Sequence, residues 1–372
     1  SLVSSLVIDK TYQLDIPEGF VVSSTGTSYA GTAYTFATQA AQTKLWSFGY
    51  NSFGALGHNS QTNYSSPIQI PGNYSSSNDN QGMVQNIYHR YAIKEDGTLW
   101  AWGKNGQGQL GQGGTTHESS PVQIPGTTWS NVSASYYGAV AVKTDGTLWN
   151  WGNNQYGQLG QGNNTATQSP IQVPGTNWSF ARGGFVRHIG LKTDGTLWGW
   201  GSNSGGALGL NNTTTVLSPV QIPGTTWTNK FHLGYRATSA VKSDGTAWTW
   251  GANDDGILGQ NQAPGTREAL SSPTQLPGTN WSTIESNGQS GSMYALKTDG
   301  TAWTWGANGY GDLGVNNTTQ YSSPVQVPGT TWEQIRVGHR GGGGRKTDGT
   351  LWLWGHNNKG QLGHNNVTQY SS

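Results

Sequence analysis

The chain has 372 residues, a formal net charge of +1 at pH 7 and 10% charged residues. This weak charge argues against bulk electrostatic binding to nucleic acid or to an anionic membrane, because both need a strong basic excess. The absence of cysteine excludes disulfides and thiol chemistry. No apolar run approaches the roughly 20 residues of a membrane-spanning helix. We therefore expect neither a nucleic-acid partner nor membrane insertion.

One short motif, an aromatic pair followed by glycine, is written seven times along the chain. Its closing glycines are 49 to 55 residues apart, at Gly49, Gly103, Gly152, Gly201, Gly251, Gly306 and Gly355. Self-similarity at such a period indicates supersecondary units that bury their apolar faces against one another. The 18 tryptophans supply much of the area that such units can bury.

One unit can be followed from residue 121 to residue 160. Short extended segments are expected at 121–126, 129–133, 139–143 and 147–151. Asp145-Gly146 predicts a two-residue type I′ hairpin turn between the last two. Four short strands, repeated seven times without helical periodicity, predict an all-β fold: a seven-bladed β-propeller of four-stranded blades. We expect residues 1–372 to form this single domain.

The two ends of the chain are complementary in sequence. The chain stops at Ser372, where every earlier unit would continue into Pro-x-Gln-x-Pro-Gly, and a similar segment occurs at residues 13–19. We therefore predict that an N-terminal strand at about residues 12–19 completes the seventh blade, which would remove two exposed sheet edges.

The unit from Lys143 to Gly160 reads Lys-x-Asp-Gly-Thr-x-Trp-x-Trp-Gly-x-Asn-x-x-Gly-x-Leu-Gly. It resembles the regulator-of-chromosome-condensation repeat family, and the resemblance covers essentially the whole chain. That family implies a seven-bladed propeller whose N- and C-terminal strands share a blade. Its members include a chromatin-docked guanine-nucleotide exchange factor, secreted inhibitor propellers, and bacterial and phage repeat proteins. The near-uniform copies here are most similar to the last group.

The residues that recur in each unit favour structural roles. The Asn-x-x-Gly-x-Leu-Gly element lacks the lysine and the helix of a phosphate-binding loop, so we interpret its asparagine as a turn residue. Asn253-Asp254-Asp255-Gly256 lacks the later carboxylate of a calcium loop. The lysine two residues before each Asp-Gly turn is expected to be a solvated rim charge. No catalytic arrangement can be argued from spacing, so we expect a non-enzyme without cofactor or metal.

The asymmetry among the units lies in arginine, histidine and tyrosine. Aligning the units on their hairpins places these residues in one equivalent loop, which predicts a ring on one face of the propeller. Arg and Tyr are enriched at binding hot spots, although the same residues could instead line the channel and satisfy buried carbonyls. The candidate residues are Tyr88, His89, Arg90, Tyr136, Tyr137, Phe185, Arg187, His188, Tyr235, Arg236, His339 and Arg340.

The leading functional hypothesis is a non-catalytic binding or structural module that recognises a protein or a glycan through loops on a propeller face. The Ser-, Thr- and Asn-rich composition, together with a start at Ser1, favours a segment of a larger extracellular or virion assembly, such as a fibre or surface adhesin. The alternative is a regulatory protein-interaction propeller, either an enzyme inhibitor or a propeller similar to the exchange factor.

Overall fold

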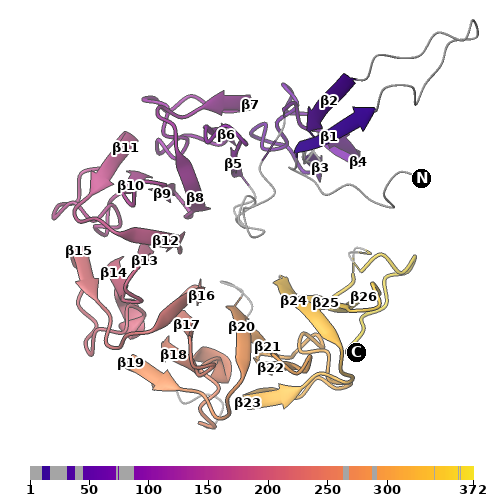
Figure 1. Cartoon of the computed structure of the whole chain (residues 1–372). Helices are drawn as coiled ribbons and strands as arrows, with labels where there is room; N and C mark the ends of the chain where they lie inside the picture. Colours follow the sequence, from indigo (N-terminus) through magenta and orange to yellow (C-terminus); the bar gives the residue numbers. More distant parts are fainter. Residues whose placement is uncertain are drawn as a thin grey trace, which may run out of the picture.

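In the computed structural model, seven β-sheets surround a common centre (Figure 1). The structure describes residues 11–16, 32–37, 45–72, 74, 88–262, 268–286, 291–338, 340–358, 360 and 362–372. We number the seven sheets blades 1 to 7 in chain order. Two 3₁₀ turns, η2 (Ser204–Gly206) and η3 (Asp254–Gly256), are the helical elements of the described part, where no helix is long and apolar enough to cross a membrane.

The blades contain the following strands. Blade 1 has β3 (Trp46–Gly49) and β4 (Tyr64–Gln69); blade 2 has β5 (His89–Ile93), β6 (Leu99–Gly103) and β7 (Glu118–Gln123); blade 3 has β8 (Trp129–Ala134), β9 (Gly138–Lys143), β10 (Leu148–Gly152) and β11 (Thr167–Val173); blade 4 has β12 (Trp178–Gly183), β13 (Arg187–Lys192), β14 (Leu197–Gly201) and β15 (Val216–Gln221). Blade 5 has β16 (Trp227–Leu233), β17 (Ala237–Lys242), β18 (Ala247–Gly251) and β19 (Leu270–Gln275); blade 6 has β20 (Trp281–Ser286), β21 (Ser292–Lys297), β22 (Ala302–Gly306) and β23 (Tyr321–Gln326); blade 7 has β24 (Trp332–Gly338), β25 (Gly341–Lys346) and β26 (Leu351–Gly355).

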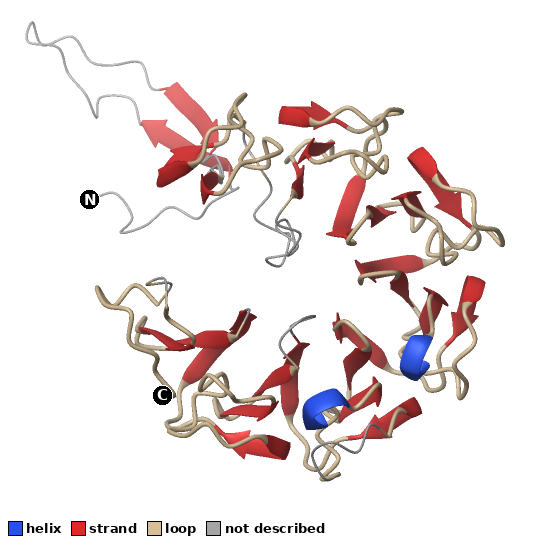
Figure 2. Cartoon of the chain, turned by 180° about the vertical axis from the view of Figure 1, so that it is seen from behind, coloured by secondary structure: helices blue, strands red, loops and turns tan. Residues whose placement is uncertain are grey.

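Each complete blade is an antiparallel sheet whose strands follow chain order from the centre outward. In blade 3 the order is β8-β9-β10-β11, with β8 nearest the centre and β11 at the outside (Figure 2). The predicted unit was therefore shifted by one strand, because the proline-containing strand β7 pairs with β6 of the preceding blade rather than with β8. Blades 3 to 6 have the four strands that the sequence predicts.

The Asp-Gly hairpin differs from the predicted type I′ turn. Gly146 has φ of +76° while Asp145 does not adopt positive φ, and the Gly146 N–H donates to Lys143 O at 3.0 Å. The loop is thus a three-residue type I turn closed by a glycine bulge. The Asp145 carboxylate stabilises this turn because it accepts the N–H and the hydroxyl of Thr147, at 2.9 and 2.7 Å.

The hydrophobic core lies between adjacent blades. In blade 3 the inner-strand Trp129 packs edge-on against Trp149 and Trp151 of the third strand. The indole N–H of Trp151 crosses to blade 2 and donates to Gln109 O at 2.8 Å. The equivalent bond recurs from Trp102, Trp200, Trp250, Trp305 and Trp354 to the preceding blade. The repeat therefore encodes the contact between blades as well as each blade's own sheet.

The predicted N-terminal closure of the seventh blade is not observed. Strand β1 (Thr11–Ile16) pairs with β2 (Thr32–Ala37) as an antiparallel hairpin, and residues 17–19 of the expected closing strand lie outside the described residues. Among the described residues, blade 7 has three strands, and beyond β26 an isolated bridge joins Gly355 to Tyr370. In the view of Figure 1 the hairpin overlies blade 1 and is away from β26.

Candidate functional site

The two ends of each blade form two different faces of the ring. The loop between the first and second strands lies at the same end as the turn between the third and fourth, as the Lys104 N–H bond to Tyr88 O at 2.7 Å indicates. We call this end the loop face. The Asp-Gly hairpins lie at the other end, where Trp129 N–H bonds to Gly97 O at 3.0 Å. The prediction that the candidate loops and the hairpins point to different ends is confirmed.

The loop between the first and second strands has the same geometry in several blades. This geometry shows which candidate residues occupy equivalent positions. The N–H groups of Ser135, Gly184 and Gly234 bond to the carbonyl three residues later, at 2.8, 2.8 and 2.9 Å. Arg187 therefore aligns with Gly138 and Ala237, at the start of the second strand, and not with Arg236 or Arg340 in the loop. The sequence analysis placed Arg187 in the loop. In the structure the loop holds only two residues and ends one position before Arg187, so that prediction was wrong by one residue.

Arg187 is a structural residue. Its side chain is buried, and its guanidinium donates to three carbonyls of blade 5: Gly234 O at 2.7 Å, Tyr235 O at 2.8 Å and Ala237 O at 2.9 Å. Burial lowers the pKa of Arg187 to about 10. Of the two roles that the sequence left open, Arg187 has the lining role: it fixes blade 5 and the loop that carries Tyr235 against blade 4.

His89 and His188 are likewise placed inside, at the start of second strands. Both side chains are fully buried. Burial lowers the pKa of each histidine to about 3, so both are neutral at physiological pH. Direct contact of these two histidines and Arg187 with a partner, one of the two roles that the sequence left open, is incompatible with their burial. Arg90 is half-buried, and His339 lies outside the described residues.

Four aromatic candidates form a continuous row across blades 3, 4 and 5 on the loop face. Tyr136 contacts Tyr137 and Phe185, both with ring centroids 4.4 Å apart, and Phe185 contacts Tyr235 at 5.2 Å. Tyr235 is 54% exposed, and the other three rings are partly exposed. We call Tyr136, Tyr137, Phe185 and Tyr235 the aromatic row.

Two charged candidates lie on the same face as the aromatic row. Arg236 pairs with Asp254 of η3 at 3.4 Å, and both side chains are more than 40% exposed. In blade 7 the guanidinium of Arg340 lies over the ring of Tyr310, 4.8 Å from its centroid, and Tyr310 contacts His356. Arg340 thus supplies a cation whose planar face already lies against an aromatic ring.

The sequence analysis missed several residues of this face. Tyr310, His356, Phe53, His117 and Lys104 all lie in or beside the turns between third and fourth strands, and Lys104 lies 5.2 Å from the Phe53 ring centroid. The variable positions of the Asn-x-x-Gly turn could have indicated these residues. This turn and the loop between the first and second strands lie on the same face, because both join strands at the same end of an antiparallel blade.

The asparagine of each repeat has the turn role that the sequence predicted. Asn154 Oδ1 accepts the Leu159 N–H at 2.9 Å, and its Nδ2 donates to Asn163 O and Thr165 O, both at 2.9 Å. All seven asparagines are buried and accept the N–H of the residue five positions later: Asn51, Asn105, Asn154, Asn203, Asn253, Asn308 and Asn357.

The repeated lysines are not simple rim charges. The ammonium of Lys143 lies 4.7 Å from the ring centroids of both Trp129 and Trp149, and most other units repeat this cation–π contact. Within the described ranges, no group of three or more His, Asp or Glu side chains could hold a metal ion. The geometry of the loop face offers contact area and cations for binding.

Comparison with known proteins assigns the family. The model of the regulator of chromosome condensation (RCC1) repeat matches residues 44–85, 96–142, 145–184, 194–241, 244–286 and 299–341, which is more than half of the chain. The chain belongs to the RCC1 repeat family. A second RCC1 repeat model matches residues 129–158. The RCC1 assignment confirms the predicted family and repeat, whereas a bacterial or phage origin is untested by it.

Solved RCC1-type propellers have the same fold. Human WBSCR16 superposes with a TM-score of 0.72 at 18% identity, over 88% of this chain and 93% of that one. Yeast RCC1 (Prp20), solved bound to Kap60, superposes with 0.68 at 16% identity, over 89% and 83%. Prp20p from Saccharomyces cerevisiae, described with its binding to Gsp1p and histones, gives 0.66 at 20% identity, over 84% and 80%. These likenesses support an all-β propeller of seven blades.

Proposed function

We propose that this chain is a protein-interaction propeller that binds its partner through the loop face. The aromatic row is the observation that carries the proposal: four rings in mutual contact, drawn from three blades and partly exposed on a rigid ring. Aromatic and arginine side chains are the residues that most often dominate binding energy at protein interfaces. Buried contacts such as those of Arg187 hold the aromatic row in place, so its side chains lose little conformational freedom when a partner binds.

The RCC1-type relatives favour the regulatory alternative over the leading hypothesis from the sequence. Yeast RCC1 has been solved bound to Kap60, and its binding to Gsp1p and histones has been described. Nothing in the comparisons supports a virion, adhesin or glycan-binding role. An extracellular setting is untested and stays a prediction.

A matched pair of double variants tests the proposed function. Phe185→Ser with Tyr235→Ser removes the middle of the aromatic row, and Ile171→Ser with Val220→Ser removes exposed apolar residues from the outer strands. In affinity purification from native lysate with quantitative mass spectrometry, we expect the partner to be recovered with wild type and with the outer-strand variant. Equal recovery with the Phe185/Tyr235 variant would contradict the proposal.

We also propose that the N-terminal strand closes blade 7 in the functional molecule. The outer edge of β26 supports this proposal, because Leu351 and Trp352 are 69% and 47% exposed whereas the equivalent Leu148, covered by β11, is fully buried. Residues 14–17 read Leu-Asp-Ile-Pro, similar to the Val-Gln-Ile-Pro of residues 122–125. The β1–β2 hairpin is the competing arrangement.

Engineered disulfides can distinguish these arrangements, because the chain has no native cysteine. By analogy with the Trp149–Gln172 pair in blade 3, closure would set Asp15 opposite Trp352, whereas in the hairpin Asp15 is opposite Ala33. Closure predicts oxidation of the Asp15→Cys/Trp352→Cys pair. Exclusive oxidation of the Asp15→Cys/Ala33→Cys pair would leave the hairpin as the solution structure.

A further inference from the structure

A group of charged side chains lies on the innermost strands of four consecutive blades, outside the loops that carry the aromatic row. Arg182 belongs to β12, Lys230 and His232 to β16, Glu285 to β20, and Arg336 to β24. These strands are nearest the centre of the ring (Figure 1). By contrast, β8 of blade 3 reads Trp-Ser-Asn-Val-Ser-Ala and carries no charge. Among the innermost strands that the structure describes, the charge is therefore concentrated on those of blades 4 to 7, one arc of the inner wall.

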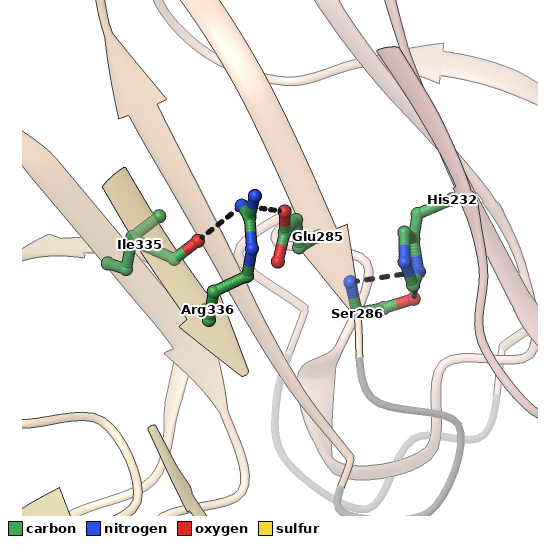
Figure 3. Close-up of polar contacts among 5 residues, drawn as sticks. All are labelled: His232, Glu285, Ser286, Ile335 and Arg336. Carbon is green, nitrogen blue, oxygen red and sulfur yellow. Dashed lines mark hydrogen bonds and ion pairs between the residues drawn. The ribbon is translucent and has the colours of Figure 1, made fainter. Parts of the chain in front are cut away.

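Contacts between neighbouring blades place these groups close together. Arg336 Nη1 bonds to Glu285 Oε1 at 2.5 Å and to Ile335 O at 3.0 Å (Figure 3). On the other side of β20, the Ser286 N–H approaches His232 Nδ1 at 3.4 Å. The Arg182 guanidinium lies over Phe231 of blade 5, 5.8 Å from the ring centroid. The arc is thus continuous from blade 4 to blade 7.

Among the described residues, the arc carries more cations than carboxylates. Three cations, Arg182, Lys230 and Arg336, all act electrostatically on the one carboxylate Glu285. Another carboxylate on β24, Glu333, is engaged by Arg345 at 2.9 Å. His232 adds no positive charge near neutral pH, because burial and the nearby arginines lower its pKa to about 3. Since three cations act on a single carboxylate, the described part of this group is net positive.

The group is also reachable from solvent. The Arg336 side chain is 45% exposed and that of Glu285 is 18% exposed, while Arg182 and Lys230 are half-buried. A guanidinium has five N–H donors, more than the two bonds of Arg336 use. Partial burial strengthens the attraction between these cations and an incoming anion relative to open water.

We propose that Arg182, Lys230 and Arg336 form an oxyanion-binding site on the inner wall, which accepts a carboxylate or phosphate group beside Glu285. This inner-wall site goes beyond the proposed protein-binding function of the loop face. Guanidinium groups supply planar paired donors to such oxyanions, and the Lys230 ammonium supplies a point charge. Glu285 repels the incoming anion, so it limits the affinity of the site.

Titration calorimetry on the full chain tests the site with two probes, inorganic phosphate and hexaglutamate. Lys230→Met should weaken binding of the anion at least tenfold, and Glu285→Gln should strengthen it about tenfold because a nearby like charge is removed. Lys242→Met is the matched control: it removes a lysine from the same blade, one that lies between Trp227 and Trp248. We expect the control to bind as wild type does.

The gain expected for Glu285→Gln keeps the test independent of folding, because a destabilised variant does not bind an anion more tightly. Phosphate that competes with hexaglutamate supports a general oxyanion site. If hexaglutamate binds and phosphate does not, the site is supported and its ligand is a carboxylate group of a partner. The proposal is overturned if neither probe shows saturable binding to wild type and Glu285→Gln at up to about 10 mM, or if Lys242→Met weakens binding as much as Lys230→Met.

Discussion

Replacement of Arg187 by methionine should destabilise the propeller strongly. Methionine keeps an unbranched apolar stem but removes all three bonds from the guanidinium to blade 5. Each hydrogen bond that involves a charged donor contributes about 2 kcal/mol, so the three contribute roughly 6 kcal/mol. These contributions are already net of the desolvation of the donor, but three bonds made by one group do not add fully. The loss expected for Arg187→Met is therefore about 4–6 kcal/mol.

The assay is equilibrium unfolding in urea, followed by tryptophan fluorescence, because buried indoles lie in blade 4 and in blade 5, on both sides of the contact. Arg340→Met is the control, since Arg340 is exposed and its ring contact with Tyr310 is worth about 0.5–1 kcal/mol. A loss below about 1 kcal/mol for Arg187→Met, no larger than that of the control, would refute the argument that Arg187 holds blades together.

Three further changes test the contacts of the repeat. Trp200→Phe should cost about 1–3 kcal/mol in urea unfolding, because it leaves Gln158 O buried without the indole donor that now lies at 2.9 Å; a neutral change would contradict this. Gly111→Ala should lower the melting temperature, since φ is +67° and a Cβ would lie 2.8 Å from Trp151 Nε1. The free energy of unfolding should fall as the pH drops below 6.5, by about 2 kcal/mol per buried histidine at pH 5. The reason is that His89 and His188 have a pKa of about 3 in the folded state, so at pH 5 they bind protons only in the unfolded state. A His89→Gln/His188→Gln variant with the same pH slope as wild type would count against that explanation.

The repeat itself could be predicted from the sequence because its signals are local and recur. The Trp-x-Trp-Gly strand, the hairpin and the asparagine turn each depend on contacts within a few residues, such as Asn154 with Leu159. Seven copies make chance resemblance implausible. The bounds of a blade were harder, since the sequence does not say whether β7 pairs with the strand before it or after it.

Individual site residues were predicted less well, because exposure in a strand alternates with every residue. A shift of one position moved Arg187 from an expected loop into the wall between blades 4 and 5. Contacts between blades, such as Arg336 with Glu285, join residues 51 positions apart. No local pattern announces such pairs, so the inner-wall site was not foreseen.

Hydroxyl-radical footprinting of the complex with the captured partner tests the central claim most directly. The method compares oxidation of side chains in the free and the bound protein. Binding through the loop face predicts that Tyr235 and its neighbours in the aromatic row become protected, while the exposed outer-strand residues Ile171 and Val220 react as before. Protection confined to the outer strands or to the Asp-Gly hairpins, with Tyr235 unchanged, would contradict the claim.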